Sequence, residues 1–182
     1  MNLRRCFYRS YRYLLILLVF LLPLLRNIPL PASFGNNAYA YLLRCFGGLY
    51  AAHSIDVTYV ILFLVPNLFL VYMFSDLMRE NCLVNYVYVF PRMGKKQKWL
   101  FRKTVQLFLQ VLIAYTLLFA IGLLLAKAAG MRFDLFDFSI LKMLLDMFFF
   151  HVWSMFLLAF LQNFLSLSYG GTQSFLFVML LY

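Results

Sequence analysis

The chain has 182 residues, of which 65% belong to the hydrophobic class and 12% are charged, and its net charge is +10. A soluble domain carries about a quarter charged residues and at this size buries only about two-thirds of its unfolded surface, so the composition excludes an ordinary soluble fold. Basic residues gather at the ends of apolar runs, which indicates membrane topology and anionic lipid rather than nucleic acid. We therefore expect an all-α, polytopic helical membrane protein.

The first predicted span covers about residues 11–30. Its uncharged core, Tyr13–Leu25, follows a basic stretch, and the side chains of Arg12 and Arg26 can snorkel to the two interfaces. A secretory signal peptide is the alternative, because the Ala-Tyr-Ala sequence at 38–40 resembles a cleavage site. That site lies too far beyond the apolar run, so we prefer a retained span.

The second and third predicted spans cover residues 57–74 and 105–126. In the second span, Pro66 should kink the helix and free a backbone carbonyl for another helix or for water. In the third span, Gln106 and Gln110 lie one turn apart and should face protein or water.

The fourth predicted span covers residues 140–167, and a partial fifth begins in residues 175–182. Lys142 and Asp146 have the spacing of an ion pair on one helix. Asp146 and His151 raise the alternative of a proton relay, but five residues separate them by about 140° on a helix, so we expect them on different faces. The last apolar run is too short to cross a membrane, so the sequence predicts four complete helices and part of another.

The orientation follows from the basic residues. Four Lys/Arg precede Tyr13 and seven lie between Arg79 and Lys103, whereas the other side of the membrane has few. The positive-inside rule therefore places the N-terminus and the loop 75–103 in the cytoplasm.

Recognisable reaction chemistry is missing from the sequence. There is no Walker A, H-E-x-x-H or G-x-S-x-G sequence, and His53 with Asp56 offers too few ligands for a metal. Cys6, Cys45 and Cys82 form no C-x-x-C pair and fall on opposite sides of the predicted membrane, so we expect small packing residues rather than a disulfide. The sequence predicts no catalytic residues, no metal and no cofactor, which makes a membrane-embedded enzyme the weakest of three functional hypotheses.

The most informative stretch is the polar loop, FSDLMRENCLVNYVYVFPRMGKKQKWLFRK, at residues 74–103. It resembles the first cytoplasmic loop of ABC-2-type transporter permeases, and especially small permease-like membrane proteins of Gram-positive bacteria found with bacteriocin or lantibiotic transport systems. The resemblance implies a multi-pass protein of the bacterial plasma membrane that pairs with a second permease subunit and a separate cytosolic ABC ATPase. The exported substrate would be a peptide or a lipid-like molecule. Family members have six spans, where this sequence predicts four and a fragment.

The resemblance also implies a coupling helix within residues 76–90. The expected ATPase-docking residues are Asp76, Arg79, Glu80, Tyr88 and Phe90. The expected contacts to lipid headgroups are Arg92, Lys95, Lys96, Lys98 and Trp99. The alternative for the loop is membrane anchoring alone, and the alternative for the whole chain is a non-transporting immunity, regulatory or accessory protein that binds a peptide or a membrane partner.

Overall fold

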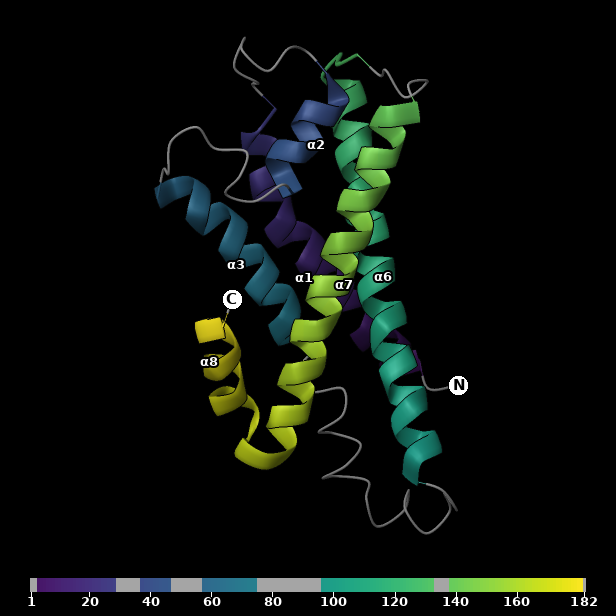
Figure 1. Cartoon of the computed structure of the whole chain (residues 1–182), viewed down its shortest axis with the longest axis vertical. Helices are drawn as coiled ribbons and strands as arrows, with labels where there is room; N and C mark the ends of the chain where they lie inside the picture. The colour runs from purple at the N-terminus through teal and green to yellow at the C-terminus, as the bar shows by residue number, and fades with distance from the viewer. Residues whose placement is uncertain (1–2, 29–36, 47–56, 75–95, 133–137, 182) are drawn as a thin grey trace. The chain divides into compact units, whose positions relative to one another are not determined.

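The computed structural model describes residues 3–28, 37–46, 57–74, 96–132 and 138–181, and over these ranges the protein is all-α, as predicted (Figure 1). Its described helices are α1 (Leu3–Arg26), α2 (Ala38–Phe46), α3 (Val57–Met73), α6 (Lys96–Ala128), α7 (Phe138–Tyr169) and α8 (Gly171–Leu181). Asn37 and Arg132 form an isolated parallel β-bridge.

The helices pack as two compact units. Unit 1 consists of residues 1–67 and 114–151, and unit 2 consists of residues 68–113 and 152–182. Helices α3, α6 and α7 contribute residues to both units, and α1 and α2 belong to unit 1 alone.

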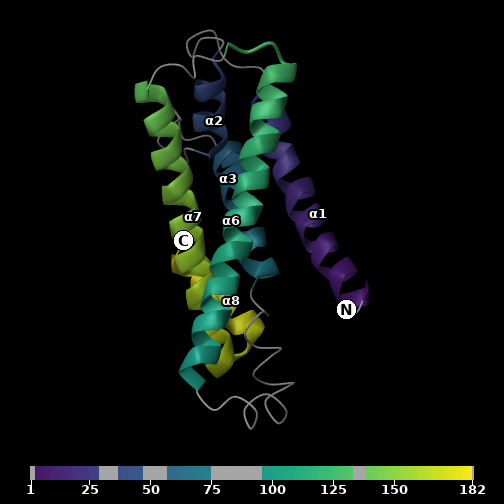
Figure 2. The ribbon, with the colours of Figure 1, turned by 90° about the vertical axis from the view of Figure 1, so that its right-hand side faces the viewer.

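The core of unit 1 begins with the two faces of α1. Ile16, Phe20 and Leu24 recur every fourth residue and are buried, whereas Leu14 and Leu18 on the other side are exposed. This spacing is that of one helical face. The ring of Phe20 meets the ring of Tyr115 edge-on, with centroids 6.4 Å apart, so the buried face of α1 packs on α6 (Figure 2).

Helix α2 packs against the C-terminal end of α1 and donates a hydrogen bond to it. The hydroxyl of Tyr41 donates to the backbone oxygen of Leu24 at 2.9 Å, near the end of α1, where carbonyls lack helical partners. At its start, the backbone N–H of Ala38 donates to the oxygen of Arg132 at 3.0 Å. A Cβ built on Gly122 of α6 would lie 2.9 Å from a methyl group of Leu42, so the small residue lets α2 and α6 approach closely.

Unit 2 is built on aromatic and aliphatic contacts between its helices. The rings of Phe108 on α6 and Phe156 on α7 meet edge-to-face with centroids 5.4 Å apart. Tyr72 on α3 meets Phe175 on α8 in the same manner, also at 5.4 Å. Val178 of α8 is fully buried, so α8 is an integral part of this core.

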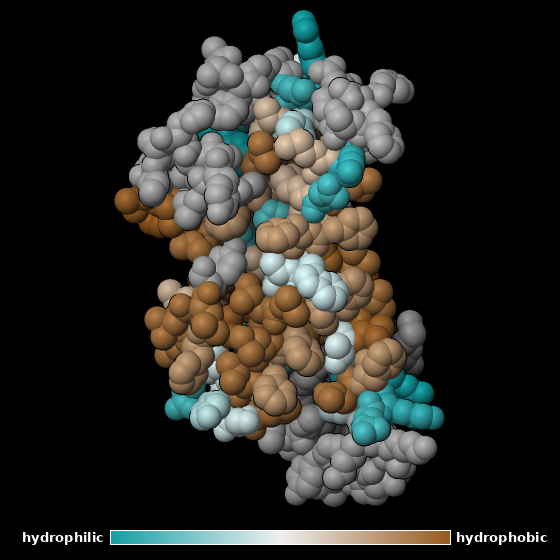
Figure 3. Space-filling model, in the orientation of Figure 1, coloured by the Kyte–Doolittle hydropathy of each residue, from teal (hydrophilic) through white to brown (hydrophobic). Residues whose placement is uncertain are grey.

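Two described helices are long and apolar enough to cross a membrane. The qualifying stretches are Gln97–Ala128, with a mean hydropathy of 2.4, and Lys142–Tyr169, with 1.9. The first contains the predicted span 105–126, and the second contains residues 142–167 of the predicted span 140–167. Large apolar side chains remain exposed along both helices, as the apolar surface in Figure 3 illustrates.

The prediction of four complete spans is wrong for the described residues. The remaining apolar helical stretches, Tyr13–Arg26, Val60–Met73 and Gly171–Leu181, have only 10–17 residues. At 1.5 Å per residue, 17 residues reach about 25 Å, which is short of a hydrocarbon core about 30 Å thick. The first predicted span was placed at residues 11–30 and the second at 57–74, whereas α1 ends at Arg26 and α3 at Met73. Residues 175–181 of the predicted partial fifth span lie within α8.

Candidate functional site

Buried polar side chains are the most informative feature of the described residues. The buried polar side chains of α3 and α7 are surrounded by apolar helices. Burying a polar group in such surroundings costs free energy, so these groups are usually retained for a function. The buried polar side chains of the described chain are Asn27, Asn67, His151, Gln162, Asn163, Ser166 and Ser174.

The first group lies in unit 1, beside the proline inside α3. Proline has no backbone N–H and its ring crowds the carbonyl four residues earlier, so Pro66 interrupts the hydrogen-bond ladder of the helix. The next residue, Asn67, is 4% exposed. Its Nδ2 donates to the oxygen of Phe63 at 2.9 Å, and its Oδ1 accepts a 2.8 Å hydrogen bond from the hydroxyl of Tyr115. This amide therefore ties the interrupted helix α3 to α6.

The carbonyl that Pro66 should free for another helix or for water stays a prediction. The hydrogen bond from this region to α6 is made by the side chain of Asn67, which follows the proline. Sequence reasoning did not identify Tyr115. A usable signal was the asparagine directly after a proline in an apolar run, because its amide needs a partner in such surroundings.

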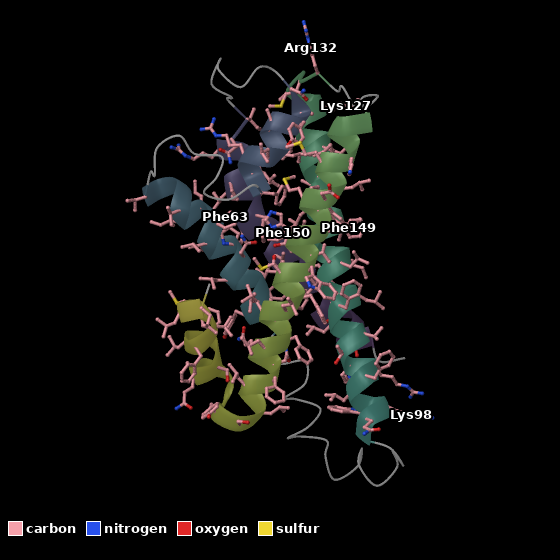
Figure 4. The ribbon with its side chains drawn as sticks, viewed as in Figure 1. Phe63, Lys98, Lys127, Arg132, Phe149 and Phe150 are labelled. Atoms are coloured by element: carbon pink, nitrogen blue, oxygen red, sulfur yellow. The ribbon has the colours of Figure 1, made fainter. Side chains whose placement is uncertain are left out.

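His151 of α7 completes this group. Its ring lies nearly parallel to that of Tyr115, with centroids 6.0 Å apart and 12° between the planes. The rings of Phe46 and Phe63 lie 6.2 and 6.5 Å away, and the imidazole is hydrogen-bonded to the backbone of Phe46. Figure 4 labels Phe63 on α3. We call Asn67, Tyr115 and His151 the polar cluster of unit 1.

The expected difference between Asp146 and His151 is confirmed. Asp146 is exposed, whereas His151 is 8% exposed and faces the aromatic core. The two side chains lie on different sides of α7 and are not arranged as a relay. Lys142 is exposed, as is Asp146.

The second group lies in unit 2, where neighbouring amides differ in their partners. Asn163 Nδ2 donates to the oxygens of Phe74 and Ala159, both at 2.8 Å. Gln162 is fully buried, and neither its Oε1 nor its Nε2 has a hydrogen-bond partner among the described residues. The buried Oε1 of Gln110 on α6 also has none.

The two glutamines predicted to face protein or water both turn partly inward. Gln106 and Gln110 are half-buried. Gln106 Oε1 accepts a 3.1 Å hydrogen bond from Lys103 Nζ, so the first glutamine is tied to the basic start of α6.

Most of the predicted docking and headgroup residues lie outside the described residues. These are Asp76, Arg79, Glu80, Tyr88, Phe90, Arg92 and Lys95. Lys96 begins α6, Lys98 is exposed (labelled in Figure 4), and Trp99 is 6% exposed. Both the docking surface and the headgroup contacts stay predictions.

Among the described residues, no group of three or more His, Cys, Asp or Glu side chains could hold a metal ion. Burial raises the pKa of the Cys45 thiol to about 12, against the opposing effect of the hydrogen bond that Asn27 Nδ2 donates to its sulfur. A thiol with so high a pKa stays protonated at neutral pH and is a poor nucleophile. Cys45 is therefore a packing residue, as its sequence context predicted.

No protein-family model, curated protein or solved structure matches this chain. The described groups that stand out are hydrogen-bonding side chains and aromatic rings enclosed in apolar helices.

Proposed function

We propose that this chain is a non-catalytic subunit embedded in a bacterial plasma membrane, where it acts as a permease of an ABC-2-type exporter. The observation that carries the proposal is the presence of buried polar side chains, His151 and Gln162 among them, in a helix long and apolar enough to cross a membrane. A helix that serves only as an anchor has no need of such groups, which are costly in hydrocarbon. Proteins that pass a substrate or change conformation within the membrane do need them.

The charges of α6 support an orientation for this subunit. Lys98, Arg102 and Lys103 lie near the start of the helix, and Lys127 lies near its end. The uncharged stretch between them has about 23 residues, or roughly 34 Å of helix, which matches a hydrocarbon core of about 30 Å. By the positive-inside rule, the start of α6 and the adjoining loop 75–103 lie in the cytoplasm.

The proposed partners follow from this orientation and from the resemblance of the loop. A separate cytosolic ATPase docks on Asp76, Arg79, Glu80, Tyr88 and Phe90. ATP-driven closure of the ATPase moves the loop and with it α3 and α6, the two helices that flank it. A second permease subunit completes the pathway for a peptide or lipid-like substrate.

Co-purification tests this proposal. The tagged chain, extracted from its native cells in mild detergent, should retain an ATPase identified by mass spectrometry through its Walker A sequence. The double substitution Asp76→Lys and Glu80→Lys should lower the recovered ATPase about tenfold or more, because buried interface charges lose several kcal/mol when reversed. The matched control makes the same charge change at Asp134 and Asp137, which the sequence predicts on the opposite side of the membrane, and should leave recovery unchanged. Absence of any ATPase from the purified wild-type chain contradicts the proposal, and so does equal recovery of the ATPase with the wild-type chain and the double variant.

One observation favours the alternative of a non-transporting immunity or regulatory protein. Only two of the described helices are both long and apolar enough to cross a membrane, which is few for a transport pathway but enough for a peptide-binding accessory protein. Expression of the chain alone, in cells without a partner ATPase, separates the two functions. Altered sensitivity of those cells to a membrane-active peptide supports the accessory role, and unaltered sensitivity leaves the permease as the better account.

A further inference from the structure

Helices α7 and α8 are joined by a turn without charge. Residues 147–182 include no Asp, Glu, Lys or Arg, although they contain the turn at Gly170 between the two helices. About a quarter of the residues of a soluble domain are charged, and most of those lie on its surface. An uncharged turn between two apolar helices is instead suited to the edge of a hydrocarbon layer.

The chain reverses its direction at this turn, within unit 2. Gly170 has a φ of 88°, a left-handed conformation that favours glycine and commonly ends helices. The ring centroids of Tyr169 and Phe177 lie 5.9 Å apart, whereas residues with this spacing in one continuous helix are separated by about 12 Å along its axis. Helix α8 therefore folds back beside the last turns of α7 (Figures 1 and 2).

The polarity of α8 changes along its axis rather than around it. Thr172 and Gln173 in its first turn are polar and exposed, whereas residues 175–181 are all apolar. A helix that lies flat on a membrane has a polar face along its whole length. The polarity of α8 instead fits a helix that enters hydrocarbon end-on, with its start at the interface. Its 11 residues reach about 16 Å, roughly half of a hydrocarbon core about 30 Å thick.

A narrow stripe of α8 packs on the described part of unit 2. Ser174 and Val178 are four residues apart and buried, and the Ser174 hydroxyl donates to the oxygen of Gly170 at 2.6 Å. The exposed side chains of α8 beyond its first turn are large, apolar and 52% to 85% exposed: Leu176, Phe177, Met179, Leu180 and Leu181. Helices that pair within membranes approach through small residues and polar side chains. Because α8 turns its small polar residue inward and its large apolar ones outward, acyl chains fit this surface better than another helix.

We propose that α7 and α8 form a hairpin that returns into the membrane, with the exposed face of α8 against the acyl chains of the cytoplasmic leaflet. The side follows from α6, whose start at Lys98 is cytoplasmic in the proposed orientation. Since α6 and α7 each cross once, α7 ends on that same side. The inference rests on the membrane crossing and orientation in the proposed function but does not need an ATPase. A second permease subunit then packs on a different face of the chain.

Fluorescence quenching in proteoliposomes tests the hairpin. Single cysteines at three positions, each in a full-length variant without the native cysteines, would carry the fluorophore nitrobenzoxadiazole. At Leu180→Cys, lipids with a nitroxide partway down the acyl chain should lower the fluorescence about twofold or more, because this face contacts hydrocarbon, and aqueous iodide should not. Gln173→Cys at the turn should show the reverse. Phe164→Cys, at an exposed position of α7, is the matched control and should behave like Leu180→Cys.

The outcomes at Leu180→Cys and Phe164→Cys separate this inference from the proposed function. Quenching of Leu180→Cys by iodide overturns the hairpin, because α8 then lies in water. Quenching by neither agent also overturns it, since another protein surface, such as a second copy of this chain, then covers α8. In both cases nitroxide quenching of Phe164→Cys leaves the crossing by α7 intact. If nitroxide lipids fail to quench Phe164→Cys as well, the crossing itself is contradicted and the proposed function fails with it.

Discussion

The two units bury polar side chains to a similar degree but provide for them differently. In unit 1, the side-chain amide of Asn67 donates a hydrogen bond to the backbone oxygen of Phe63 and accepts one from the hydroxyl of Tyr115. In unit 2, Gln162 is as deeply buried but makes no hydrogen bond, although the adjacent Asn163 makes two. Burial alone therefore does not reveal what a polar group contributes. The same residue type stabilises a unit where it has partners and destabilises it where it has none.

The largest change in the free energy of unfolding is expected on substitution of Asn67, whose amide has hydrogen-bond partners. Asn67→Leu should lower the free energy of unfolding by about 2–3 kcal/mol, because it removes two buried hydrogen bonds, one from the Tyr115 hydroxyl and one to the backbone oxygen of Phe63. Reversible unfolding in mixed detergent micelles measures this change. A loss below about 0.5 kcal/mol would mean that the hydrogen bond contributes little.

A change of the opposite sign in the free energy of unfolding is expected on substitution of Gln162, whose amide has no hydrogen-bond partner among the described residues. Gln162→Leu should raise the free energy of unfolding by about 1–2 kcal/mol, because a side chain of similar length replaces an amide that has no partner. Asn163→Leu is the matched control on the neighbouring residue and should be destabilising, since it breaks the bond to Phe74. If Gln162→Leu is destabilising too, the amide has a partner in the membrane that the isolated chain lacks.

A smaller loss is expected at the end of α1. Tyr41→Phe should cost about 1 kcal/mol, because it removes one neutral hydrogen bond to the backbone oxygen of Leu24 and preserves the ring. The same unfolding experiment measures it. A cost as large as that of Asn67→Leu would show that capping of α1, rather than the polar cluster, dominates the stability of unit 1.

The smallest effect at neutral pH concerns the buried thiol. Because burial raises the pKa of Cys45 to about 12 in the folded chain, above an ordinary thiol value of about 8.5, folding favours the protonated form. Its contribution to stability is complete below about pH 8.5 and is lost as the pH rises toward 12. Maleimide labelling of Cys45 at pH 7, in a variant lacking Cys6 and Cys82, should be at least tenfold slower in the folded than in the unfolded chain. Equal labelling rates would contradict the burial of this group.

The sequence was sufficient for features that depend on long uniform runs. The uncharged stretches of the third and fourth predicted spans have the length and hydropathy of membrane-crossing helices, and both lie in long helices. The span count failed at the second predicted span although its bounds, 57–74, agree with α3 to within one residue. This helix has only 17 residues and contains the polar Asn67, so it falls at the short limit for crossing a hydrocarbon core.

The candidate site was less accessible to sequence reasoning. Asn67 and Tyr115 are 48 residues apart, and no local periodicity links them. Gln162 and Asn163 are neighbours of the same chemical kind, yet only the packing of α7 decides which one reaches Phe74. Contacts of this kind depend on how helices approach, which residue patterns within one helix do not specify.

Membrane crossing by α6 is the central claim, and accessibility of single cysteines at its two ends tests it most directly. Lys98→Cys and Lys127→Cys, each in a variant without the native cysteines, would be treated with a membrane-impermeant maleimide in sealed inverted and right-side-out vesicles. We expect Lys98→Cys to react only from the cytoplasmic side and Lys127→Cys only from the other side. Reaction of both positions from the same side would contradict a membrane-spanning α6 and the orientation proposed for this protein.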